Sequence, residues 1–108
     1  MKRVIRSSSN FDMEFVPELS WEFVEDTILP QLKEKVIEKF GRRYKKIAVD
    51  LDDIAWEGNR MQAEVIVYNN NQEKSRGMFT FAAWDNYFDE GDFYSHLRQK
   101  IASFVNAL

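Results

Sequence analysis

The chain has 108 residues, of which 44% are hydrophobic and 15% aromatic, and this predicts one domain, residues 1–108, that buries its own core. Its 15 basic and 18 acidic residues give a net charge of −3. The absence of cysteine excludes disulfides, thiolate metal sites and a cysteine nucleophile.

The N-terminal residues predict neither a secretion signal nor a membrane anchor. Val4 and Ile5 are followed by the polar run 6–10, where a signal peptide would carry an apolar segment. Elsewhere, too, the apolar stretches fall short of the roughly 20 residues of a membrane span. We therefore expect a cytoplasmic protein, with no membrane partner and no cofactor.

Apolar residues alternate with single acids near the N-terminus, at Phe11, Met13 and Phe15. A period of two is typical of a short, half-buried strand. Residues 1–16 are therefore expected to form either an N-terminal arm or an added strand at the edge of a sheet.

Residues 20–40 predict the first helix, with Ser20 as its N-cap and Gly41 at its end. The apolar positions at helical spacing are Trp21, Val24, Ile28, Leu32, Val36 and Phe40. Pro30 interrupts this pattern, because proline lacks an amide hydrogen and crowds the preceding turn. We expect either a kink near Thr27 or two helices, the second capped by Thr27 with Pro30 in its first turn.

Three strands are predicted within residues 45–84. The apolar positions of the first strand change parity at Asp52–Asp53, which predicts a bulge there. Residues 57–60 predict a hairpin turn, and a second strand follows over 61–68. The run 69–72 predicts a turn or loop before a third strand over 76–84.

Asp89 is expected to cap a final helix over residues 89–108. Its apolar stripe comprises Phe93, Leu97, Ile101, Phe104 and Leu108. The fold class is therefore α+β, in the order α-β-β-β-α: a three-stranded antiparallel meander with an N-terminal and a C-terminal helix on one face.

A second apolar surface is predicted on the sheet face away from the helices. Residues 1–16 could cover it, a homodimer could close over it, or it could bind another protein through aromatic anchors and an acidic rim. The candidate protein-binding residues, from this face and the loop that follows, are Ile66, Tyr68, Met78, Trp84, Asp85, Tyr87 and Phe88.

Charge along the chain is segregated into blocks. Residues 7–32 hold six acids and no base, which favours a protein partner with a basic surface. A basic block over residues 39–46 is the alternative interface, for nucleic acid, and comprises Lys39, Arg42, Arg43, Lys45 and Lys46. Since basic residues also complement the dipole at a helix C-terminus, nucleic acid is not the favoured partner.

Reactive groups for an enzyme are few, so we expect no catalytic residue and no metal site. His96 is the single histidine and is expected to be structural. Asp50 and Asp52 share one side of a strand and could bind a cation, although solvated acids are the favoured interpretation. Asp53 and Glu64 resemble the spacing of restriction-endonuclease-like nucleases, but Ile66 replaces the lysine that would orient the attacking water.

Two further resemblances bear on function. The element order is that of the double-stranded RNA-binding domain, but residues 89–92 put acids where that family binds phosphate. The opening residues 1–9 resemble small uncharacterised proteins of phages and conjugative elements of Gram-positive bacteria, and the motif 89–94 is similar in character. This resemblance implies a small accessory protein, such as an inhibitor of a host protein.

Overall fold

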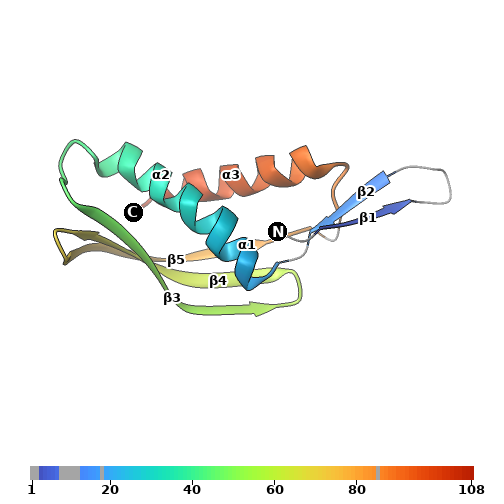
Figure 1. Cartoon of the computed structure of the whole chain (residues 1–108), viewed down its shortest axis with the longest axis horizontal. Helices are drawn as coiled ribbons and strands as arrows, with labels where there is room; N and C mark the ends of the chain where they lie inside the picture. Colours follow the sequence, from blue (N-terminus) through green and yellow to red (C-terminus); the bar gives the residue numbers. More distant parts are fainter. Residues whose placement is uncertain (1–2, 8–12, 18, 85) are drawn as a thin grey trace.

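The computed structural model describes residues 3–7, 13–17, 19–84 and 86–108 (Figure 1). Its elements in chain order are β1 (Arg3–Ser7), β2 (Met13–Pro17), α1 (Trp21–Phe23), the π-helical turn η1 (Val24–Ile28), α2 (Leu29–Phe40), β3 (Ile47–Glu57), β4 (Arg60–Asn69), β5 (Gln72–Ala82) and α3 (Glu90–Asn106). The predicted α+β class and the order helix, three antiparallel strands, helix are confirmed.

The core lies between the sheet β3-β4-β5 and the two long helices, which cover the same face (Figure 1). Val65 and Phe81 from the sheet meet Leu32 of α2 and Leu97 of α3, and all four side chains are fully buried. Burial of each such side chain contributes roughly 1.5–3 kcal/mol. None of the helices in the described ranges is long and apolar enough to cross a membrane.

The N-terminal strands form a hairpin of their own. β1 pairs with β2 in antiparallel register, and neither strand pairs with the three-stranded sheet. The hairpin extends beyond one end of the sheet and approaches α3 through β2 (Figure 1). The alternative of an added edge strand is therefore wrong, and the N-terminal arm describes these strands better. Phe11 lies outside the described residues.

Both predicted N-caps are confirmed. The Ser20 hydroxyl accepts a hydrogen bond from the Phe23 amide at 3.2 Å, and the Asp89 carboxylate accepts one from the Asp92 amide at 2.9 Å. Each satisfies one of the amides that the first turn of a helix leaves without a helical partner. These caps fix where α1 and α3 begin.

Pro30 is accommodated by a wide turn and not by a break. The Leu29 amide donates to the carbonyl of Val24, five residues back, and Pro30 occupies the first turn of α2. A π turn relieves the clash between the proline ring and the preceding turn and keeps the chain helical. Pro30 in a first turn is as predicted, but the Thr27 cap is wrong, because α2 follows η1 without a side-chain cap.

The bulge and both turns lie where the sequence predicts them. Strand pairing shifts between Asp52 and Ala55, and Asp53 has a φ of 49°. Gly58 takes a φ of 62° in the first turn. The second turn needs only residues 70–71, both with positive φ, so β5 starts at Gln72, earlier than predicted.

Lys39 of α2 holds the C-terminal end of α3. Its ammonium group donates to the main-chain oxygens of Val105, Asn106 and Leu108 at 3.0, 2.8 and 2.6 Å. Carbonyls at a helix end lack helical partners and carry partial negative charge. A cation there donates hydrogen bonds to them and also complements the helix dipole. Lys39 therefore has a structural role, and its role as a nucleic-acid contact stays a prediction.

Candidate protein interface

The sheet face away from the helices is less apolar than predicted. Ile66, proposed as an exposed contact, is buried at 4% exposure, and Tyr68 is half-buried. Met78 is exposed to 50%. The prediction for Ile66 is wrong because it sits on the central strand, flanked by Asp50 and Arg76, so neighbouring side chains cover it.

Charged groups cross this face. The Arg76 guanidinium forms ion pairs with Glu64 on β4 and with Glu73 on β5. The hydrogen bond from Arg76 lowers the pKa of Glu73, and the same bond raises the pKa of Arg76. An ion-paired strip through the middle of the face weakens it as an apolar docking surface.

Three carboxylates gather at the bulge of β3. Ligand atoms of Asp52, Asp53 and Glu64 lie within 4.8 Å of one another, a group that differs from the predicted pair of Asp50 and Asp52. Asp52 also accepts a hydrogen bond from the Asp53 amide at 2.9 Å, and Glu64 is paired with Arg76. Exposed acids are common without a bound ion, so we do not assign this cluster as a metal site.

All three tryptophans of the chain are exposed, at the end of the three-stranded sheet where α1 and α3 begin. Trp21 is exposed to 52%, Trp56 to 42% and Trp84 to 57%, and Phe88 reaches 80%. Tryptophan is usually well buried, so this arrangement is unusual. We call Trp21, Trp56, Trp84 and Phe88 together the aromatic end.

Contacts between elements bring this end together. Trp21 begins α1, Trp56 lies just before the β3–β4 turn, and Trp84 and Phe88 lie between β5 and α3. The Ala83 amide donates to the Asn59 carbonyl, which ties the chain after β5 to that turn. The Phe23 and Phe93 rings, 5.7 Å apart, join the starts of the two helical segments.

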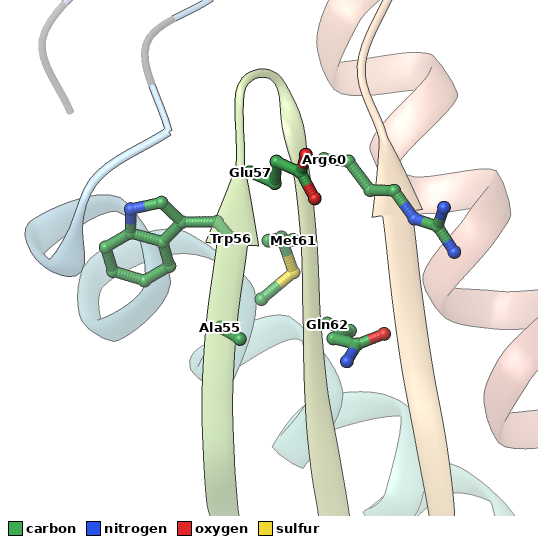
Figure 2. A pocket seen from close by; sticks show the side chains of 6 residues that line it. All are labelled: Ala55, Trp56, Glu57, Arg60, Met61 and Gln62. Atoms are coloured by element: carbon green, nitrogen blue, oxygen red, sulfur yellow. The ribbon is translucent and has the colours of Figure 1, made fainter.

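Trp56 borders a surface hollow of about 310 Å³ at the β3–β4 hairpin. Figure 2 shows its indole pointing away from Met61 and toward α1. The other residues that line the hollow are Ala55, Glu57, Arg60 and Gln62. Met61 is buried and forms the floor of the hollow.

Trp84 is held by two rings that face it. Its indole stacks on Tyr87, with centroids 4.9 Å apart, and on His96 of α3, at 4.4 Å. Tyr87 is 2% exposed, so its prediction as a surface contact is wrong: it supports Trp84 from below. Trp84 consequently leans on α3 and does not extend the open sheet face as predicted.

Carboxylates surround the aromatic end. The exposed ones among the described residues include Glu22, Glu25, Asp26, Glu57, Asp89 and Asp92, and Arg60 lies among them. Asp89, Glu90 and Asp92 also complement the N-terminal dipole of α3. Asp85, predicted as a contact, lies outside the described residues.

The predicted basic block lies at the opposite end of the sheet, between α2 and β3. Arg42, Arg43, Lys45 and Lys46 are exposed. The Arg43 guanidinium sits over the rings of Phe40 and Tyr44, at 5.2 and 5.6 Å, so part of this block packs on the protein itself.

Sequence reasoning found Trp84 and Phe88 but not Trp21 and Trp56. Helical spacing places Trp21 on the apolar stripe, yet it is the first residue of α1, ahead of the buried Phe23 and Val24, and is exposed. The change of parity at the bulge gives no signal for Trp56, because it pairs this residue with the buried Met61 and so predicts burial. Trp56 is exposed because it lies at the end of an edge strand, next to the turn.

Comparisons with known proteins add no family. No family model, no curated protein and no solved structure matches the chain. The resemblance to proteins of mobile elements therefore stays a prediction, and any function has to be inferred from the residues and the fold.

Proposed function

We propose that this chain is a non-enzymatic protein-binding module whose aromatic end docks on a basic surface of another protein. The observation that carries the proposal is the exposure of all three tryptophans and Phe88 at one end of the fold. An inhibitory role toward a host protein, which the resemblance implies, would use the same end.

Exposed indoles suit this role energetically. Tryptophan is enriched among the few residues that contribute most of the binding energy of protein interfaces, because one side chain buries a large, rigid area. Tyr87 and His96 stack on Trp84, so this anchor loses little side-chain freedom on binding.

The carboxylates around the anchors favour one class of partner. Glu22, Glu57 and Asp92 are exposed near the tryptophans. Negative charge around an apolar contact speeds association with a basic surface and discriminates against acidic ones. We therefore expect binding that weakens as the salt concentration rises.

The test compares capture by the native chain and by a variant of the aromatic end. Trp21→Ser, Trp56→Ser and Phe88→Ser are combined, and each protein is immobilised and exposed to cell lysate at low and high salt. The matched control is Ile37→Ser, which removes a side chain exposed to 54% on α2, away from this end.

We expect a basic protein that the native chain and the Ile37→Ser control retain at low salt and the triple variant does not. Circular dichroism checks that all three proteins are folded. Equal capture by the triple variant, or equal loss with Ile37→Ser, would refute the aromatic end as the interface.

A further inference from the structure

Trp84 presents one covered and one open ring face. Its centroid lies 4.4 Å from that of His96 and 4.9 Å from that of Tyr87, with interplanar angles of 20° and 22°. Rings on opposite faces of the indole would be separated by nearly the sum of these two distances. The Tyr87 and His96 centroids are only 5.8 Å apart, so both rings cover the same face.

Hydrogen bonds lock this arrangement. The Trp84 amide donates to the Tyr87 hydroxyl at 3.0 Å, and that hydroxyl lies 2.7 Å from Nδ1 of His96. Burial lowers the pKa of His96, as does Lys100 one turn later, and this favours a neutral imidazole whose Nδ1 can accept a hydrogen bond from the Tyr87 hydroxyl. The open indole face is therefore held in a fixed place, beside an uncharged ring.

A hollow on α3 adjoins Trp84. Its other lining residues, Asp92, Ser95, His96 and Gln99, form one side of the helix. They provide a carboxylate, a hydroxyl and an amide in the same hollow as the Trp84 ring. A ring face and a nearby carboxylate together favour a planar cation that can stack and donate hydrogen bonds at once.

We infer that the open face of Trp84 and the carboxylate of Asp92 form a binding site for a guanidinium group, an arginine side chain of the partner. The inference rests on the proposed function, since it names the group on a basic partner that this end would recognise. Arginine fits better than lysine, because a guanidinium is planar and more weakly hydrated.

The charges nearest the site support a cation. The N-terminus of α3 has a partial positive charge equivalent to roughly half a proton, which would repel one. Asp89, Glu90 and Asp92 in the first turn together outweigh that charge. Lys100 lies one helical turn beyond His96 and two turns along α3 from Asp92.

The experiment titrates the whole chain with blocked tripeptides and follows the indole N–H signal of each tryptophan by NMR. The probes are Gly-Arg-Gly, Gly-Lys-Gly and Gly-citrulline-Gly, the last an uncharged analogue of arginine. Asp92→Asn is the test variant, since it keeps the size of the side chain, and Glu34→Gln is the matched control, which removes the charge of an exposed acid on α2.

We expect the arginine peptide to shift the Trp84 signal saturably, with the lysine peptide weaker and the citrulline peptide weaker still. Asp92→Asn should weaken arginine binding by about two- to fivefold, and Glu34→Gln should leave it unchanged. Equal binding of the citrulline peptide, or an unmoved Trp84 signal, would overturn the site.

The two experiments can refute the arginine site and the larger interface independently of each other. If the Trp84 signal does not move but the Trp21, Trp56 and Phe88 variant still loses a basic partner, the interface stands and the arginine site is wrong. If the arginine peptide binds at Trp84 but that variant captures the partner as well as the native chain does, the larger interface is wrong.

Discussion

His96 is the residue whose charge decides how Trp84 is held. Its neutral ring can accept a hydrogen bond from the Tyr87 hydroxyl, whose oxygen accepts one from the Trp84 amide. A protonated ring would donate a hydrogen bond from Nδ1. The Tyr87 hydroxyl could then no longer donate to the ring and would have to accept from both the ring and the Trp84 amide. Asp92 lies one turn before His96 and Lys100 one turn after it, and burial is the larger cause of its lowered pKa.

This shift predicts a loss of stability in mild acid. The pKa of His96 is lowered in the folded state from its reference value of 6.5. Above pH 6.5 the ring is neutral in both states and its contribution is fully present. As the pH falls below 6.5, the unfolded chain binds the proton first, so the free energy of unfolding decreases until the folded pKa is passed.

The measurement is thermal unfolding between about pH 7 and pH 5, for the native chain and for His96→Gln. The glutamine keeps a hydrogen-bond acceptor for Tyr87 and does not titrate. We expect the native chain to lose more stability than the variant over this range. Parallel curves for the two proteins would contradict a half-buried His96 with a lowered pKa.

At the scale of secondary-structure elements, packing between α2 and α3 depends on one lysine. Lys39 makes three hydrogen bonds to the end of α3, and these partners are 66 to 69 residues away in the sequence. Helical periodicity could place Lys39 at the end of α2, but only the packed fold brings the end of α3 to it.

Lys39→Met should therefore lower the free energy of unfolding by about 1–2 kcal/mol, because it removes charged hydrogen bonds and keeps the aliphatic stem. Urea unfolding measures the change. Lys46→Met is the control: its side chain is exposed in the same basic block, and we expect a change within about 0.5 kcal/mol. Equal effects of the two variants would mean that the hydrogen bonds of Lys39 to α3 add nothing to the free energy of unfolding.

At the scale of the whole molecule, the question is which surface meets a partner. The predicted homodimer would close over the open sheet face, and this would bury the ion pairs of Arg76 with Glu64 and Glu73. Desolvating such groups is unfavourable unless the partner replaces their water contacts. Because a homodimer through the sheet face would have to desolvate these ion pairs, we expect the chain not to dimerise through that face.

Light scattering at increasing concentration tests this expectation. Met78 is the exposed apolar side chain in the middle of the open face, so Met78→Lys should leave both the mass and the melting temperature nearly unchanged. A dimer that dissociates with Met78→Lys would instead establish the sheet face as an interface between two copies.

The sequence by itself determined the elements of this protein, because caps, turns and periodicity act over a few residues. Ser20 and Asp89 cap the helices, the bulge lies at Asp53, and the polar turns are where the pattern predicts them. Pro30 shows the limit of such reasoning: its position was predictable, but the π turn that accommodates it was not.

Only the tertiary structure decided which of those residues reach solvent. Tyr87 and Ile66 are buried, and Trp21, Trp56 and Trp84 gather at one end of the fold. Exposure depends on contacts between segments far apart in the sequence, whose pairing no local pattern encodes. The candidate interface is therefore a property of how α1, the β3–β4 turn and the start of α3 pack together.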